Sequence, residues 1–180
     1  APGEYIAGDQ TNHTLFEQSA VNLEENSNRN PVPYVIPPGI YQEVYTGTLS
    51  TIRQNEQALQ LSVENLVDGD ARAVYKSTSF DFRYYQKLRM FIHAEKMYEY
   101  DNMEDGDLTV FLRFGSDLTD NYYEYEVPLK FTEWHTSSTD DFAIWPEENN
   151  IEINCGARNC FSCGLCYEKN DVSIINEKLK

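Results

Sequence analysis

Apolar and polar residues alternate along the middle of the chain with a period of two. In residues 58–63, Leu59, Leu61 and Val63 share one face, and polar residues occupy the positions between them. Strict alternation over five or more residues is typical of β-strands that bury one face. The same alternation recurs in four further segments, which comprise residues 71–77, 87–95, 107–115 and 121–131. The pattern therefore predicts five or more strands.

The segment 87–95 shows how this alternation divides a strand into two faces. Its apolar residues are expected to point into a core, and they are Leu88, Met90, Ile92 and Ala94. Between them, Arg89, His93 and Glu95 are expected to point outward, because successive side chains of a strand lie on opposite faces. On this interpretation His93 is a simple surface residue.

Turn residues separate the predicted strands. Gly69 and Gly106 each lie between two aspartates, which favours a tight turn because glycine accepts positive φ and aspartate bonds the turn backbone. Pro128 predicts an edge strand or a bulge, because proline cannot donate a backbone hydrogen bond. Residues 49–153 contain no long amphipathic helical pattern. We therefore predict an all-β domain there, an antiparallel β-sandwich with jelly-roll-like organisation.

The first 48 residues differ from this domain. Residues 1–30 are polar and are expected to be irregular, with one short helix around residues 14–23. Residues 31–48 form a proline-rich strap, which is expected to be extended because proline fixes φ. A stiff segment loses little entropy on docking, so we expect the strap to pack along the sandwich or against the rest of a larger protein, the alternative being an ordinary linker. The residues expected to dock are Pro33, Tyr34, Val35, Ile36, Pro37, Pro38 and Ile40.

Charge and composition narrow the function classes. The chain has a formal net charge of -16, which argues against nucleic acid as a partner because phosphates need a basic surface. No run approaches the roughly 20 apolar residues that span a bilayer as a helix. Carboxylate pairs such as Glu95 with Glu124 or Glu126 arise readily by chance among 30 acidic residues, and the three histidines share no ligand spacing. We therefore expect neither an enzyme nor a cofactor.

Four segments of the chain resemble the SprA family, also called Sov. They read PYVIPPGI (33–40), TIRQNEQALQLSVENLVDGDARAVYK (51–76), FDFRYYQKLRMFIHAE (80–95) and DGDLTVFLRFGSDLTDNYYEYEVPL (105–129). The similarity extends from the N-terminal region to about residues 145–153. Members of this family are giant outer-membrane translocons of the type IX secretion system, linked to gliding motility.

The resemblance implies a large transmembrane β-barrel as the parent protein, of which this chain would be one piece. The piece would be a soluble, non-catalytic structural and interaction domain, either periplasmic or extracellular. Its partners would be the rest of the translocon barrel and other secretion-system proteins, at the outer membrane or cell surface. The charged outward positions of the predicted strands agree, because lipid-facing strands carry apolar outward residues.

The main alternative is a carbohydrate-binding module. Trp134, Trp145 and Tyr122 would then form an aromatic platform for sugars, unless both tryptophans are rim residues that close the ends of the sandwich. A calcium site built from loop carboxylates would accompany the platform. Residues 101–108 do not fit an EF-hand, because Met103 stands where that loop needs an oxygen ligand. A solvated hairpin turn is the simpler interpretation of that stretch.

The C-terminal tail, residues 154–180, gathers all four cysteines of the chain. Close thiolates bind zinc or an iron–sulfur cluster, but the usual zinc pattern has two well-separated pairs. Disulfides or reduced thiols are the alternatives, and an exported protein favours disulfides over clusters. The tail also departs from the SprA-like pattern, so we expect it to be disordered, a genuine variant or the frameshifted end of a gene fragment. The candidate ligands are Cys155, Cys160, Cys163 and Cys166.

Overall fold

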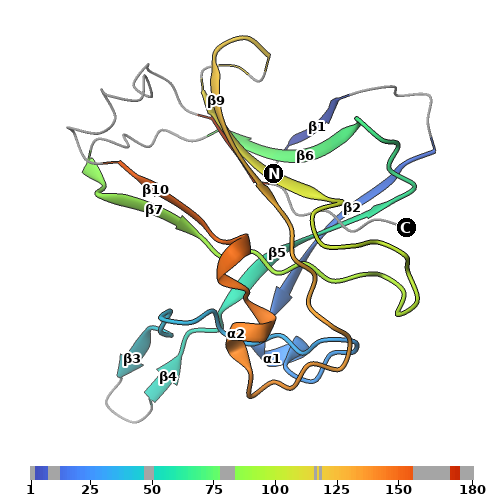
Figure 1. The fold of residues 1–180 in the computed structure, drawn as a ribbon. Helices are drawn as coiled ribbons and strands as arrows, with labels where there is room; N and C mark the ends of the chain where they lie inside the picture. The colour runs from blue at the N-terminus through green and yellow to red at the C-terminus, as the bar shows by residue number, and fades with distance from the viewer. Residues whose placement is uncertain are drawn as a thin grey trace.

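Antiparallel strands make up most of the computed structural model, which describes residues 3–7, 13–46, 51–77, 84–115, 117, 119–155 and 171–174. The largest sheet has the strand order β1-β6-β11-β8-β9. Figure 1 labels β1, β6 and β9 of this sheet. Its strands are β1 (Gly3–Ala7), β6 (Ala71–Ser77), β11 (Asp171–Ile174), β8 (Thr109–Gly115) and β9 (Tyr122–Pro128).

Smaller elements complete the described chain. Three two-stranded sheets pair β2 (Leu15–Asn22) with β5 (Gln57–Glu64), β3 (Val44–Thr46) with β4 (Thr51–Arg53), and β7 (Lys87–Met90) with β10 (Ile151–Asn154). The helices are short: α1 (Leu23–Asn26), α2 (Asp141–Ile144) and the 3-10 helix η2 (Glu147–Asn149). The all-β, antiparallel prediction is confirmed, whereas the sandwich packing and the jelly-roll connectivity stay predictions.

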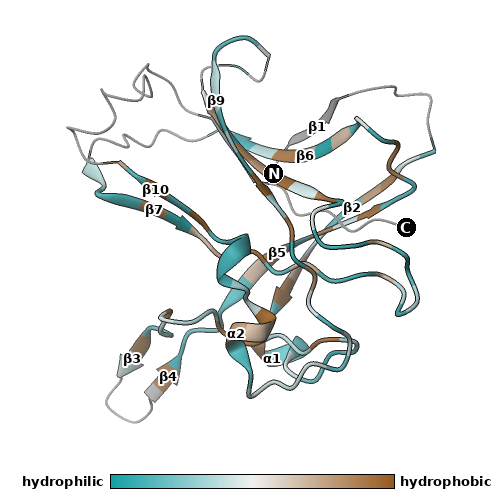
Figure 2. Ribbon diagram, in the orientation of Figure 1, coloured by the Kyte–Doolittle hydropathy of each residue, from teal (hydrophilic) through white to brown (hydrophobic). Residues whose placement is uncertain are grey.

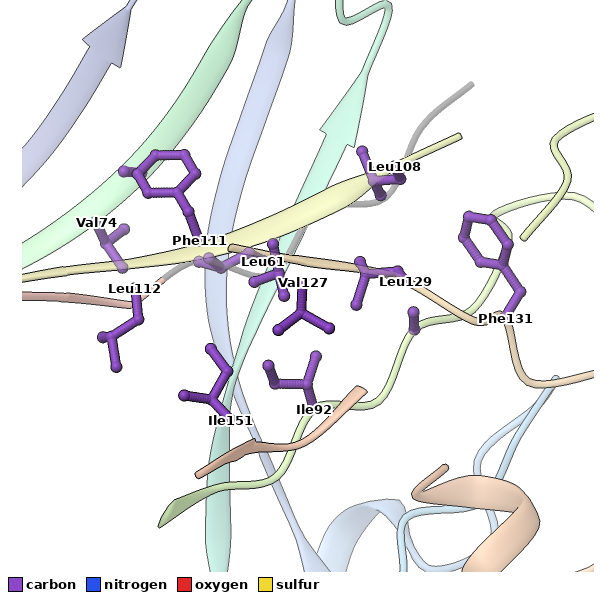
Figure 3. Close-up of a cluster of buried hydrophobic side chains, with 13 residues drawn as sticks. Leu61, Val74, Ile92, Leu108, Phe111, Leu112, Val127, Leu129, Phe131 and Ile151 are labelled. Carbon is purple, nitrogen blue, oxygen red and sulfur yellow. The ribbon is translucent and has the colours of Figure 1, made fainter. Parts of the chain in front are cut away.

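Alternating side chains of several strands meet in one large apolar cluster, which we call the main core. Val110 on β8 lies opposite Val127 on the edge strand β9, and both are buried. Figure 3 shows Leu61 from β5 and Ile151 from β10 near Val127, and all belong to this cluster with Val110. The inward positions predicted for Leu61, Val63, Ile92 and Ala94 are confirmed by their burial, whereas Leu59 is 38% exposed. Pro128 ends an edge strand as expected.

The predicted glycine turns are also present. Gly69 has φ +84° and Gly106 has φ +92°, values that side chains with a Cβ atom rarely adopt. The carboxylate of Asp107 accepts a hydrogen bond from the backbone N–H of Glu104, at 2.7 Å. Aspartate thus closes the second turn while glycine supplies its conformation.

The helix expected around residues 14–23 is wrong. Leu15–Asn22 instead form strand β2, which pairs with β5 along its full length. The edge of β5 presents unpaired backbone groups, and an adjacent extended segment satisfies them more completely than a short isolated helix would. Helix α1 begins only after β2, where the Asn22 side chain accepts a hydrogen bond from the Glu25 N–H at 2.9 Å and caps the helix.

The tail contributes an element that the sequence pattern did not predict. Strand β11, residues Asp171–Ile174, lies between β6 and β8 in the five-stranded sheet. Among the described residues, no helix is long and apolar enough to cross a membrane.

Candidate interaction site: strap, polar clamp and hairpin

The first half of the strap is fastened to the domain itself. Val32 and Tyr34 are buried in a second apolar cluster with Ile144 and Trp145, which we call the strap cluster. The Tyr34 backbone N–H donates to the carbonyl oxygen of Asn26, at 2.9 Å. The extended backbone predicted from the prolines brings these side chains to the body of the domain.

The strap residues expected to dock differ in exposure. Tyr34 and Pro37 are buried, whereas Pro33, Val35, Ile36 and Pro38 are half-buried and Ile40 is exposed. The Trp145 indole N–H donates to the Val35 carbonyl oxygen at 3.0 Å, so the strap backbone is held as well. That these residues also dock a partner protein stays a prediction.

Tyr34 joins apolar and polar contacts in the strap cluster. Its ring packs edge-on against Trp145, with the ring centroids 6.1 Å apart. Its hydroxyl donates a hydrogen bond to the carboxylate of Glu56. Burial raises the pKa of Tyr34 well above its ordinary value, and the hydrogen bond to Glu56 raises it further.

A buried ion pair holds Arg29, which lies two residues before the strap. Arg29 donates from Nη1 to Glu95 Oε1 at 2.8 Å and from Nη2 to Glu95 Oε2 at 2.6 Å. The Arg29 Nε–H donates to the Val32 carbonyl oxygen at 3.1 Å. Glu95 is 1% exposed, so this two-pronged pairing is what satisfies its buried carboxylate. Arg29, Glu95 and His93 form what we call the polar clamp.

His93 connects the clamp to the strap cluster. Its Nδ1 lies 2.7 Å from the Ile144 carbonyl oxygen, and its Nε2 lies 3.3 Å from Glu95 Oε2. Its ring also packs edge-on against Trp145, with centroids 5.9 Å apart. Segments around residues 29, 93 and 144 therefore meet at one polar centre.

The prediction that His93 and Glu95 point to solvent is wrong. The His93 side chain is only 15% exposed, and that of Glu95 is fully buried. The strand ends at Met90, and Glu95 forms an isolated bridge with Thr132. The strap cluster covers the face on which the alternation places these polar residues. Because they are covered, they need partners within the protein, and Arg29 supplies the opposite charge.

The second half of the strap leads into a hairpin made of β3 and β4. This hairpin projects from the rest of the described chain in Figure 1, and Figure 2 shows apolar residues on both strands. Its large apolar side chains are exposed: Tyr41, just before β3, is 88% exposed and Ile52 is 62% exposed. Val44 and Tyr45 are exposed as well. Tyr45 lies opposite Ile52 in the pairing of β3 with β4. Exposed apolar side chains that gather in this way commonly mark an interaction surface.

The aromatic residues of the sugar-binding alternative do not share one open face. Trp145 is 5% exposed, and its ring is covered by Tyr34 and His93. The indole N–H of the half-buried Trp134 donates to the Lys96 carbonyl oxygen at 3.0 Å. The Tyr122 ring lies under the Arg113 guanidinium, 3.8 Å from its centroid. The buried Trp145 therefore cannot act as a platform ring in this arrangement.

The acidic candidates are engaged in local contacts. Glu124 pairs with Arg113 at 2.7 Å, and Asp105 accepts the backbone N–H of Phe131 at 2.8 Å. Within the described residues, no group of three or more His, Cys, Asp or Glu side chains could hold a metal ion.

The cysteine candidates are placed only in part. Cys155 is buried, and its N–H donates to the Gln86 carbonyl oxygen at 2.8 Å. Cys160, Cys163 and Cys166 lie outside the described residues. Metal binding by this set is a prediction that the structure leaves untested.

Sequence reasoning missed Arg29 and Thr132 altogether. Arg29 lies in a polar segment with no periodic pattern, and its partner is 66 positions away. The Thr132 hydroxyl donates to the Ile144 carbonyl oxygen at 3.3 Å, twelve positions further along the chain. A lone cation directly before a proline-rich segment was the only local signal for Arg29.

Comparison with protein-family models finds a match over most of the chain. The family model SprA_N, described as motility related/secretion protein, matches residues 4–162. This match covers β2 through β10, and thus the strap, the polar clamp and the hairpin, and it extends beyond Ile153 to include Cys155 and Cys160. No curated protein matched the chain in a second search. The chain belongs to the SprA_N family of motility-related secretion proteins.

Proposed function

We propose that this chain is a non-catalytic structural and interaction domain of a large outer-membrane translocon, acting in type IX protein secretion and gliding motility. Membership in a motility-related and secretion family supports a role in secretion and motility. The partners would be the rest of the translocon barrel and other secretion-system proteins. The domain itself would be soluble, on the periplasmic or extracellular side of the outer membrane.

The exposed hairpin is the observation that carries this proposal. The strap is fastened at Tyr34 and Val35, while the chain that continues from it presents Tyr41, Tyr45 and Ile52 to solvent. A fastened base and a projecting apolar end form an arrangement suited to holding a neighbouring protein surface. Apolar side chains that are exposed in this way gain free energy when a partner covers them.

The charge of the domain supports the choice of partner class. At a net charge of -16, the chain repels other acidic surfaces and favours encounters with neutral or basic protein surfaces. The hairpin then supplies short-range contact once an encounter has occurred.

The hairpin is tested by a pair of matched double substitutions in the full-length parent protein, expressed in cells. Tyr41→Ser with Ile52→Ser removes two exposed hairpin side chains. Tyr100→Ser with Leu15→Ser removes side chains of the same types and similar exposure, 89% and 58%, outside the hairpin. A photo-crosslinking residue placed at Tyr45 reports contact with partner proteins.

The hairpin variant is expected to lose crosslinks to translocon proteins and to secrete at most about a tenth of the normal cargo, while the control variant secretes normally. A tenfold weaker partner contact corresponds to about 1.4 kcal/mol, which burial of two large side chains readily supplies. Normal secretion together with an absence of crosslinks at the hairpin would contradict the proposal.

A further inference from the structure

The largest sheet of the domain ends at strand β9, which has an open edge. Among the described residues β9 pairs only with β8, and the register runs without a bulge from Gly115 opposite Tyr122 to Thr109 opposite Pro128. In an antiparallel pair, alternate residues of a strand direct their backbone N–H and C=O groups away from the neighbouring strand. β9 therefore presents a row of backbone hydrogen-bonding groups that no described strand uses.

The usual protections of an edge strand are weak in β9. Such strands are commonly interrupted by a proline or a bulge, or they carry lysine on the exposed edge. Here Pro128 is the last residue of the strand, and residues 122–127 contain neither proline nor lysine. The strand is seven residues long, which is enough to pair with an added strand through several hydrogen bonds.

One face of β9 continues the main core toward this edge. Val127 is buried in that core, and Tyr125 lies two positions before it on the same face. Tyr125 lies opposite Leu112, which is 1% exposed, whereas Tyr125 itself is 42% exposed. The row of core side chains therefore ends at a large ring that the described residues cover only in part. An apolar side chain placed beside this ring would extend the row.

The opposite face of the strand carries negative charge. Glu124 and Glu126 share this face, and both residues are exposed. Arg113 on β8 pairs with Glu124, at 2.7 Å. Glu126 lies opposite Phe111 and makes no ion pair with the described residues. This face of the edge therefore favours a neighbouring strand that carries a cation.

These charges decide between a second copy of the chain and a different partner. Two copies of β9 aligned antiparallel about Tyr125 would place Glu124 of each copy opposite Glu126 of the other, which like-charge repulsion disfavours. The net charge of -16 adds to the repulsion between copies. A basic segment from another protein meets neither obstacle.

We propose that β9 binds an extended basic segment of a partner protein, which adds to the sheet as a further strand. Backbone hydrogen bonds join the segment to the open edge. Its side chains alternate between the two faces, with a lysine or arginine beside Glu126 and an apolar residue beside Tyr125. The inference rests on the proposed function only in taking the partner to be a protein, and β9 is not part of the hairpin.

Binding of a defined peptide to the full 180-residue chain tests the edge. The probe is the fluorescein-labelled peptide Gly-Thr-Lys-Val-Lys-Val-Thr-Gly, titrated by fluorescence anisotropy. In an extended conformation its lysines share one face and its valines share the other. Saturable binding is expected, and replacement of both lysines by glutamate should raise Kd at least about tenfold.

Methylation of backbone nitrogens separates strand addition from simple charge attraction. One companion peptide carries N-methyl groups on both lysines and another carries them on both valines, so the side chains and their charges are unchanged. Only one of these two sets of N–H groups can face β9, because successive N–H groups of a strand point to opposite sides. We expect one methylated peptide to bind at least about tenfold more weakly and the other to bind within about threefold of the parent peptide.

Substitutions locate the binding at β9. Glu126→Lys is expected to raise Kd at least about fivefold, whereas Glu104→Lys makes the same charge change at an exposed residue outside the strand and should change Kd less than about twofold. Tyr125→Thr retains a residue suited to a strand and should raise Kd about threefold, while its control Tyr100→Thr should leave Kd unchanged. Circular dichroism of each variant verifies that the fold is retained.

The proposal is overturned if the parent peptide fails to saturate, if the two methylated peptides bind equally, or if the control substitutions weaken binding as much as those in β9. A dimer of the chain in sedimentation velocity that the peptide dissociates would also overturn it, because a second copy would then occupy the edge. The hairpin variant Tyr41→Ser with Ile52→Ser should still bind the peptide. Failure of the hairpin proposal in cells is thereby distinguished from failure of strand addition.

Discussion

The main core and the strap cluster of this domain are built in different ways. In the main core, apolar side chains from neighbouring strands meet with little polar content, as Val110 and Val127 do. The strap cluster is smaller, and it is joined through His93 to a buried ion pair between Arg29 and Glu95. Its segments are mostly irregular, so they lack a continuous strand ladder that would fix their relative positions.

This difference shows two sources of structural specificity. A sheet fixes its side chains through backbone pairing, and the apolar residues then need only suitable volume. Irregular segments require directional contacts, which the clamp provides through bidentate hydrogen bonds. We therefore expect the main core to tolerate conservative changes that the clamp does not.

The largest effect is expected for Glu95→Gln. The change keeps the shape of the side chain but leaves the Arg29 guanidinium without its counter-charge. We expect a loss of about 3 kcal/mol in the free energy of unfolding, the lower end of the range for broken buried pairs, because the Arg29 side chain keeps 22% exposure. Urea denaturation measures the loss.

The double variant Arg29→Met with Glu95→Gln serves as the control for charge. Removing both charged groups should raise the free energy of unfolding by at least about 1 kcal/mol relative to Glu95→Gln alone, since no unpaired charge remains. A double variant as unstable as the sum of the single variants would show that the pair acts only through packing.

An intermediate effect is expected for Tyr34→Phe, which removes the hydroxyl that donates to Glu56. We expect a loss of about 1.5 kcal/mol at neutral pH, typical of a hydrogen bond to a charged group. The raised pKa also makes a prediction for high pH. Above about pH 10 the unfolded chain releases the Tyr34 proton while the folded chain retains it, so stability falls as the pH rises.

Denaturation at pH 8 and near pH 11 separates these two contributions. The Tyr34→Phe variant should lose less stability between the two pH values than the parent chain does, because one group with a raised pKa has been removed. Equal losses in both proteins would mean that Tyr34 ionises as readily in the folded chain as in the unfolded one.

The smallest effect is expected for Leu112→Met in the main core. Leu112 is fully buried, but methionine conserves its volume and adapts to the surrounding side chains. We expect a loss of about 1 kcal/mol or less by urea denaturation. A loss as large as that of Glu95→Gln would remove the contrast between the two clusters.

The local pattern predicted the main core well. Period-two alternation located β5, β6, β8 and β9, and it placed Leu61, Val63 and Ile92 on buried faces. The Asp-Gly-Asp turns followed from the need for positive φ at Gly69 and Gly106. These features depend on residues close together in the chain, which is why sequence reasoning reached them.

The strap cluster and the clamp depend on contacts that no local pattern contains. Alternation gave the correct phase for Glu95 and His93, but it could not show that the strap cluster would cover their face. Trp145 was considered as an exposed platform or rim residue because its cover, Tyr34, lies more than a hundred positions earlier. In each case a segment distant in the sequence buries the residue, which no local pattern shows.

The position of β11 has a consequence for the order in which the sheet assembles. Its partner β6 ends at Ser77 and its other partner β8 ends at Gly115, but β11 begins only at Asp171. During synthesis both partners emerge well before the strand that separates them. The sheet can reach its final strand order only after that late segment arrives, so the pairing of such distant residues should make completion of the sheet a slow step in folding.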